Sequence, residues 1–166
     1  MNEKTRNITT AALMAAAVFV VTRFIQIPIP LGYFNVGNAV ILLFCLVVRS
    51  PWGIAASGIG SGLADLVSYP VYTVPTLIIK AIMPALYYLI REKLGDRKFA
   101  PVIAVAVSTL IPLFGYTITG GILYGGFAAG LAQFPGLLVE YAANLVIFAI
   151  LHKPVEAASK QIYRAA

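Results

Sequence analysis

Three ionisable side chains lie inside long apolar stretches of this 166-residue sequence: Asp65, Lys80 and Glu140. A charged side chain in bilayer hydrocarbon costs about 2.5–3.5 kcal/mol on insertion scales, so each requires a partner or a water-filled cavity. Asn144 follows Glu140 by four residues, which places it one helical turn further along the same face. These residues are therefore candidates for a buried polar binding site.

Other polar and aromatic residues lie at comparable positions in their apolar runs. Asn35 and Asn38 open one run, Tyr72 begins another, and Tyr116 lies within a third. Each has a second interpretation, because Asn commonly caps helices and Tyr is enriched at membrane interfaces. The charged groups also admit two interpretations. In the first, Lys80 forms a buried ion pair with Asp65 or Glu140 whose role is purely structural, because it holds helices together. In the second, the three side chains bind a ligand.

The composition indicates a membrane protein. Apolar side chains make up 60% of the chain and charged ones 11%, against roughly 45–50% and about 25% in ordinary globular proteins. The values exclude most cytosolic enzymes and intrinsic disorder. The net charge is +6, but the basic residues are spread between apolar runs, so no nucleic-acid partner is expected. The single cysteine, Cys45, allows neither an intrachain disulfide nor a cysteine metal site.

The apolar runs predict an all-α integral membrane protein, a six-transmembrane-helix bundle forming a single membrane domain over residues 1–166. Proline, glycine and charged clusters separate the runs. A spanning helix takes about 20 residues, so six short spans nearly fill the chain. The first is interpreted as a retained span rather than a cleaved signal. The predicted spans are residues 8–27, 35–48, 51–68, 73–90, 101–124 and 137–151, with a cytoplasmic tail over 152–166.

The basic residues predict the orientation, because Lys and Arg are retained on the cytoplasmic side. With the N-terminus inside, one basic residue, Arg23, lies outside and ten lie inside. The ten are Lys4, Arg6, Arg49, Arg91, Lys93, Arg97, Lys98, Lys153, Lys160 and Arg164. Both termini are then cytoplasmic, and the candidate polar groups gather in the outer half of the bilayer. This predicts a pocket that opens outward, whereas a pore needs polar lining through the whole thickness.

Small residues spaced four apart mark two of the predicted helices. In the first they are Ala11 with Ala15 and Ala12 with Ala16, and in the third Ser57 with Ser61 and Gly58 with Gly62. Such pairs let a neighbouring helix approach closely in lipid. For the third helix, packing within the chain is favoured. For the first, a docking face for another subunit and internal packing remain open.

Several kinds of chemistry are excluded by the motifs that the sequence lacks. It contains no GxxxxGK[ST] phosphate loop and no HExxH, and one His with one Cys cannot supply a hydrolytic set. We therefore expect no enzyme activity, no catalytic residue, no metal and no cofactor. Uptake against a gradient needs energy from an ion or from partner proteins. A stand-alone ion-coupled transporter using Asp65 and Glu140 and a non-transporting scaffold are the alternatives.

The stretch GYFNVGNAVILL, followed by SPWGIAASGIGSGLADLVSYPVYTVPTLIIKAIM, resembles the substrate-capture subunits (S components) of energy-coupling factor (ECF) vitamin importers. The resemblance covers roughly residues 8–152 and is most specific over 32–83. The alanine face is similar to the Ala-x-x-x-Ala patch with which that family contacts its coupling subunit. One difference is Asn38, where relatives often have Asp, so a ligand assignment that needs a negative charge there does not carry over.

The resemblance implies a six-helix, multi-pass subunit of a prokaryotic cell membrane that binds a vitamin or precursor from outside. It would topple when it docks on one coupling transmembrane (T) subunit with two ATPase subunits. The loop between the first two helices would be the lid, with Arg23, Tyr33 and Phe34 in it.

Two acids and one base in the candidate pocket disfavour a strongly anionic ligand. Carboxylates and amides can bond to hydroxyl, amino and protonated ring nitrogen groups while an aromatic side chain stacks on a ring. We expect a compact ring of the vitamin B6 (pyridoxine) or hydroxymethylpyrimidine type first, and riboflavin next.

Overall fold

The computed structural model describes residues 2–48, 50–95 and 97–165, with side chains described as far as Ser159. Helices form almost all of it, and one short hairpin interrupts them. The elements in chain order are α1 (Glu3–Phe24), β1 (Ile27–Ile29), β2 (Gly32–Phe34), α2 (Gly37–Phe44), α3 (Trp52–Ser68), the 3-10 turn η1 (Pro70–Tyr72), α4 (Thr73–Leu94), α5 (Ala100–Ser108), α6 (Leu110–Leu123) and α7 (Phe127–Ala165).

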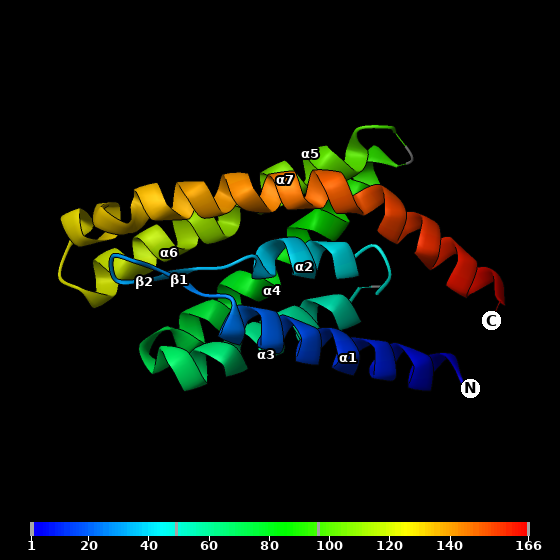
Figure 1. The fold of residues 1–166 in the computed structure, drawn as a ribbon, viewed down its shortest axis with the longest axis horizontal. Coiled ribbons are helices and arrows are strands. Elements are labelled where there is room, and N and C mark those ends of the chain that lie inside the picture. The colour runs from blue at the N-terminus through cyan, green and yellow to red at the C-terminus, as the bar shows by residue number, and fades with distance from the viewer. Residues whose placement is uncertain (1, 49, 96, 166) are drawn as a thin grey trace.

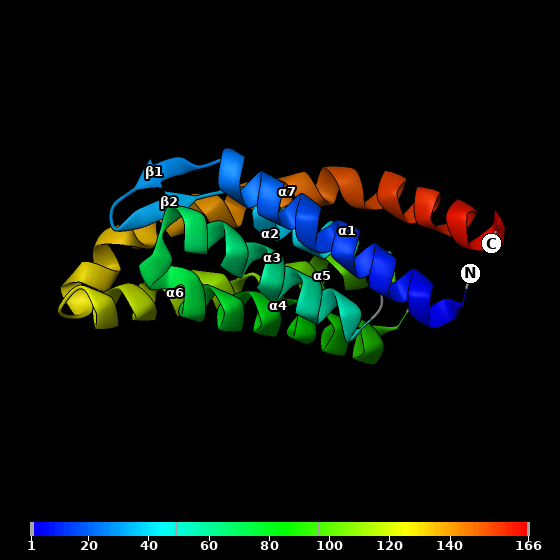
Figure 2. The ribbon, with the colours of Figure 1, turned by 90° about the horizontal axis from the view of Figure 1, so that it is seen from below.

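The helices run roughly along one long axis, so that their connections collect at two ends (Figure 1). The β1–β2 hairpin, the α3–α4 junction and the α6–α7 turn lie at one end, which we call the hairpin end. Both chain termini and the α4–α5 connection lie at the opposite end, which we call the terminal end. The view from below shows the same separation (Figure 2). The basic residues of α1, α4, α7 and the α4–α5 connection that were assigned to the cytoplasm belong to the terminal end, whereas Arg49 and the side chains of Lys160 and Arg164 lie outside the described residues.

Local sequence signals explain where several helices begin and end. The Asn2 side chain accepts a hydrogen bond from the Lys4 amide and caps the start of α1. Gly95, with φ of 58°, ends α4. Gly125 and Gly126, both with positive φ, form the tight turn between α6 and α7. The chain therefore reverses where residues without a Cβ permit it.

The all-helical class is confirmed, with four helical segments of the described chain long and apolar enough to cross a membrane. They are Glu3–Phe24, Pro70–Leu94, Ala100–Leu123 and Phe127–Ser159. α2 and α3 are shorter, at 8 and 17 residues. Large apolar side chains such as Phe24, Ile122 and Phe127 project outward from the bundle, as in helices that pack among lipid tails.

Several predicted boundaries differ from the structure. The first span, predicted over 8–27, is helical over Glu3–Phe24, and the fourth, predicted over 73–90, continues to Leu94. The segment over 101–124 is divided into α5 and α6 at Thr109, because Pro112 cannot donate to the Ser108 carbonyl. The predicted span 35–48 is helical only over Gly37–Phe44 and continues in turns to Val48. The last helix begins at Phe127 rather than 137 and extends through the predicted tail to Ala165, with Pro135 and Pro154 inside it.

The predicted loop between the first two helices forms an antiparallel hairpin rather than an irregular segment. Ile27 pairs with Phe34, and Ile29 pairs with Gly32. Each strand is only three residues long, too short for an alternating pattern to identify it in the sequence.

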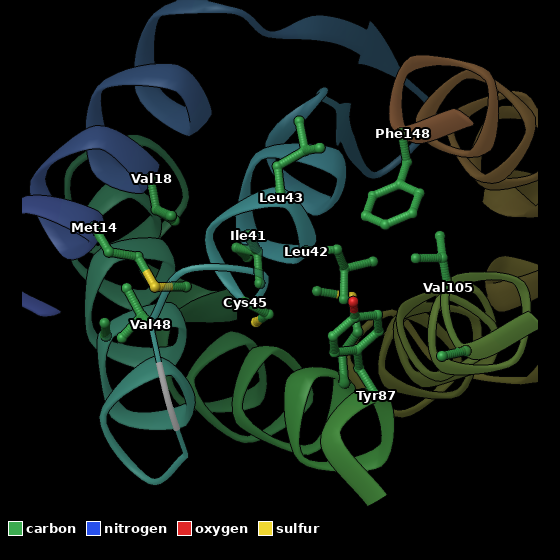
Figure 3. Packing of buried hydrophobic residues seen from close by; sticks show 13 residues of the cluster. Met14, Val18, Ile41, Leu42, Leu43, Cys45, Val48, Tyr87, Val105 and Phe148 are labelled. Carbon is green, nitrogen blue, oxygen red and sulfur yellow. The ribbon is translucent and has the colours of Figure 1, made fainter. Parts of the chain in front are cut away.

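The apolar core surrounds α2, whose Ile41 and Leu42 are fully buried (Figure 3). Met14 and Val18 of α1 approach it from one side and Phe148 of α7 from another. Met14 and Val18 lie nearer the terminal end than Thr22 on α1. The same holds for Met83 and Tyr87 relative to Thr76 and Lys80 on α4, and for Phe148 relative to Glu140 on α7. The interior is therefore apolar toward the terminal end and polar toward the hairpin end.

Small residues on α3 allow α1 and α4 to pack closely on both of its sides. A Cβ placed on Gly60 would lie 2.5 Å from the Ala15 carbonyl oxygen of α1. One placed on Gly58 would lie 3.0 Å from the Leu77 carbonyl oxygen of α4. The predicted internal packing of this helix is confirmed.

Candidate functional site

A hollow at the hairpin end collects polar residues from α1, β2, α3, α4, α6 and α7 and from the segments that join them. Its cavity volume is about 30 Å³. Seven of the residues predicted from the sequence line it, namely Tyr33, Asn35, Asp65, Tyr72, Lys80, Tyr116 and Glu140. The other lining residues are Thr22, Gly32, Tyr69, Thr76, Gln133 and Leu137.

Asn38 lies between the two charged groups at the base of this pocket. Its Oδ1 accepts a hydrogen bond from Lys80 Nζ, and its Nδ2 donates to Glu140 Oε1 at 2.7 Å. Lys80 and Glu140 are 2% and 4% exposed. The Asn38 amide thus joins α4 to α7 through α2. Lys80 and Glu140, which were predicted as a possible ion pair, are connected through this amide.

Asp65 is also buried and receives hydrogen bonds on both oxygens. Tyr33 of the hairpin donates to Oδ1, and Thr76 of α4 donates to Oδ2. Thr76 also lies 3.0 Å from the Tyr116 hydroxyl of α6, and Lys80 Nζ lies 5.5 Å from the centre of the Tyr116 ring, within cation–π range. The carboxylate is therefore the centre of a network that spans four elements.

The Tyr33 hydroxyl remains a donor in this network. Burial and then the neighbouring Asp65 carboxylate raise its pKa far above the usual value of 10.0, because both disfavour a phenolate. Tyr33 therefore covers the pocket in its protonated form. Its ring lies 5.4 Å from the Tyr69 ring, which extends the aromatic wall.

Three residues predicted for the pocket or its lid lie outside the pocket lining, namely Asn38, Asn144 and Phe34. Asn144 supports the start of α2, since its Oδ1 accepts from the Ala39 amide at 2.6 Å and its Nδ2 donates to the Asn35 carbonyl at 3.1 Å. Phe34, on β2, is half-buried and does not line the hollow. Asn35 has both roles, because it lines the hollow and its Oδ1 accepts from the Gly37 amide at 2.7 Å.

The sequence interpretation missed Thr22, Thr76 and Gln133. Thr76 precedes Lys80 by four residues and Gln133 precedes Glu140 by seven, so helical spacing places each pair on one face. Gln133 was not considered because residues 127–136 were interpreted as a turn. Its Nε2 donates to the Tyr116 carbonyl at 2.6 Å and joins α7 to α6. Among the described residues, His, Cys, Asp and Glu do not gather in threes that could hold a metal.

The alanine face borders a second, entirely different hollow. We call it the α1–α3 groove, and its lining is Ile8, Ala11, Ala12, Ala15, Ala16, Phe19, Val20, Trp52, Ala55, Ala56, Ile59 and Leu63. Every one of these side chains is apolar. Ala12 and Ala16 are exposed, whereas Ala11 and Ala15 are half-buried. The Ala12–Ala16 pair is therefore the more accessible of the two.

Three comparisons relate the chain to known proteins. The family described as "ECF-type riboflavin transporter, S component" matches residues 2–157. A Pyrococcus woesei protein described as "Uncharacterized protein in gap 3'region" is 29% identical over 134 residues, which are 79% of this chain and 88% of the relative. A solved structure described as "Structure and mechanism of the S component of a bacterial ECF transporter" has a TM-score of 0.73 at 19% identity, over 92% of this chain and 96% of that one. The last likeness shows a shared fold.

Proposed function

Because this chain belongs to the family of S components of ECF-type riboflavin transporters, we propose that it captures a compact heteroaromatic vitamin or vitamin precursor in the pocket at its hairpin end. S components are the substrate-binding subunits of vitamin transporters and are not enzymes. One observation carries the proposal. Buried ionisable and amide groups from α2, α3, α4 and α7 meet beneath a hairpin that covers them.

The chemistry of the lining favours a ring with several polar substituents. Asp65 and Glu140 can accept hydrogen bonds, Lys80 can donate, and Tyr72 and Tyr116 offer aromatic surface. Pyridoxine and hydroxymethylpyrimidine combine a small ring with hydroxyl or amino groups, and they are the preferred ligands. Riboflavin is the second candidate, and the description of the matching family supports it.

Binding measured on the purified chain tests this proposal. Calorimetric titration in detergent with pyridoxine, hydroxymethylpyrimidine and riboflavin should give saturable binding for one of them. Lys80→Met should weaken that binding at least about 100-fold, because it leaves the buried Glu140 without its cation. Leu13→Met is the control, since Leu13 is 65% exposed on α1 and does not line the pocket. Saturable binding of none of the three would reject the ligand class.

The proposal includes an orientation, with the hairpin end outside and both termini in the cytoplasm. Six crossings then correspond to α1, α2, α3, α4, α5 with α6, and α7. Labelling with a membrane-impermeant thiol reagent, in a Cys45→Ser background, checks it. Pro28→Cys at the hairpin should react in intact cells, and Ala158→Cys on α7 should react only after lysis. The opposite pattern would reverse the orientation.

The partners of the family complete the proposal: one coupling T subunit and two ATPase subunits in the same bilayer. We assign the α1–α3 groove to the T subunit, because it is apolar, lined by small residues and open on the outside of the bundle. Stand-alone, ion-coupled uptake is the alternative. Gradient-driven uptake into liposomes by the isolated chain without ATP would support that alternative and contradict the proposal.

A further inference from the structure

The Tyr33 hydroxyl donates to one oxygen of Asp65, and the Thr76 hydroxyl donates to the other. Asp65 and Thr76 lie on α3 and α4, which pack directly against each other, so their bond is fixed by the bundle. Tyr33 lies on the hairpin instead. Its bond to Asp65 is therefore the one that can be exchanged without separating two helices.

The hydrogen bonds within the β1–β2 hairpin contribute little to keeping it in place over the pocket. A two-stranded hairpin is at best marginally stable in isolation, and Leu31 in its turn has a φ of 62°, which is unfavourable for a residue other than glycine. Other contacts also attach it to the bundle, among them the Tyr33 ring against the Tyr69 ring at 5.4 Å. Ile29 packs against Gly136 of α7, and Gln26, just before β1, donates to the Ser68 hydroxyl at 3.2 Å.

Among the residues that the structure describes, two hydroxyls in the same pocket have no hydrogen-bond partner. They are Thr22 Oγ1 and Tyr72 Oη, and both residues are at least nine-tenths buried. Buried polar groups are normally paired, so an unpaired one calls for an explanation. The closed pocket thus leaves two hydroxyls free, while each oxygen of Asp65 already accepts a hydrogen bond from a group of the protein. A bound molecule with complementary polar groups would pair the first two and compete for the third.

We propose that the Tyr33 hydroxyl takes the place of a hydrogen-bond donor of the substrate, and that binding exchanges the Tyr33–Asp65 hydrogen bond for one from the ligand. The inference rests on the proposed function and deepens it. The substrate then carries a hydroxyl, amino or protonated ring nitrogen group for Asp65, and further polar groups for Thr22 and Tyr72. Tyr33 is a specificity-determining residue that admits only ligands able to replace its own donor.

Tyr33→Phe tests this, because it keeps the ring and removes only the hydroxyl. In the ligand-free protein, hydrogen exchange of the backbone amides over residues 27–34 should become about 2- to 10-fold faster, the net effect of one lost hydrogen bond. Calorimetric affinity for whichever of pyridoxine, hydroxymethylpyrimidine or riboflavin binds should rise by a similar factor. Tyr88→Phe is the matched control, since the Tyr88 hydroxyl donates to the Val48 carbonyl at 2.5 Å and Tyr88 does not line the pocket, and it should change neither quantity.

Unchanged exchange over 27–34 in Tyr33→Phe would overturn the inference. So would weaker binding, because it would make the hydroxyl a direct ligand contact rather than a competitor. If neither the wild-type chain nor Tyr33→Phe binds any of the three probes, the proposed ligand class is rejected instead. The exchange rates would still decide the role of Tyr33 in that case, so the two failures are distinguishable.

Discussion

At the scale of single residues, Asn38 shows why an amide suits the base of the pocket. It accepts from Lys80 and donates to Glu140 at the same time. An ionised Asp could accept from the lysine but could not donate to a second carboxylate. The choice of Asn rather than Asp at this position therefore has a physical consequence in this chain. The amide lets one cation and one acid share a single bridging group.

Asn38→Asp should accordingly destabilise the fold, because it removes the donor to Glu140 and places two acids together. We expect a loss of about 1–3 kcal/mol, the cost of a buried group left unpaired. Thermal unfolding of the purified protein in detergent measures it. The double variant Asn38→Asp with Glu140→Gln restores a donor opposite the new acid and should recover most of the stability. If the single variant is as stable as the wild type, the bridge does not exist.

Spacing in the sequence was enough to predict Asp65, Lys80 and Glu140 as one group. Each lies at a similar distance from the same end of its apolar run, and helices of one bundle bring equal depths together. Spacing could not predict the bond between Tyr33 and Asp65, because 32 residues separate them and the hairpin sets their approach. It also could not assign Asn144 to the support of α2 rather than to the pocket.

At the scale of elements, α3 determines how closely the bundle can pack around the pocket. Its Gly60 meets α1, and its Gly58 meets α4. These contacts fix the position of Asp65, which lies on α3 one and a half turns after Gly60. Without a Cβ at the crossing, backbone atoms approach within van der Waals distance, which drives helix association in lipid. Small residues on this helix therefore serve the site indirectly.

Gly60→Ala tests the contribution of this crossing. The added methyl would lie 2.5 Å from the Ala15 carbonyl oxygen, and a backbone atom of a packed helix cannot move aside freely. We expect a destabilisation of about 1–3 kcal/mol, as in other overpacked interiors, seen as a lower melting temperature in detergent. Gly32→Ala is the control, because a Cβ there meets nothing within 4 Å. Equal melting temperatures for the two variants would argue against a tight α1–α3 crossing.

The effect of prolines on the helices could not be predicted from the sequence. Pro112 was predicted inside a span, and the structure shows a break at Thr109 just before it. Pro135 was interpreted as the end of a turn, yet it lies within α7. Helices of membrane proteins tolerate such residues because neighbouring groups satisfy the freed backbone atoms. Sequence alone does not show which proline finds that compensation, and Gln133 was missed for this reason.

At the scale of the whole molecule, the polar pocket and the apolar core divide the bundle lengthwise. On α4, Thr76 and Lys80 line the pocket, whereas Met83 and Tyr87 further along belong to the core. A ligand bound at the hairpin end thus meets close-packed side chains on its way to the terminal end. In the proposed function it leaves through the mouth by which it entered. Release on the other side of the membrane then requires the whole subunit to reorient, which makes its docking surface essential to transport.

Ala16→Trp tests whether the α1–α3 groove is that docking surface. Ala16 is exposed and lines the groove, so a bulky side chain would fill the space where a partner helix approaches. Co-purification with the T subunit and ATPases should fall at least about tenfold, which corresponds to a loss of about 1.4 kcal/mol in the association. Vitamin affinity should stay unchanged, because the pocket lies at the hairpin end. Leu13→Trp is the control, since Leu13 is exposed on α1 but outside the groove. Equal losses of co-purification in both variants would show that the groove has no special role in docking. A loss of vitamin affinity in Ala16→Trp would show instead that the alanine face serves internal packing.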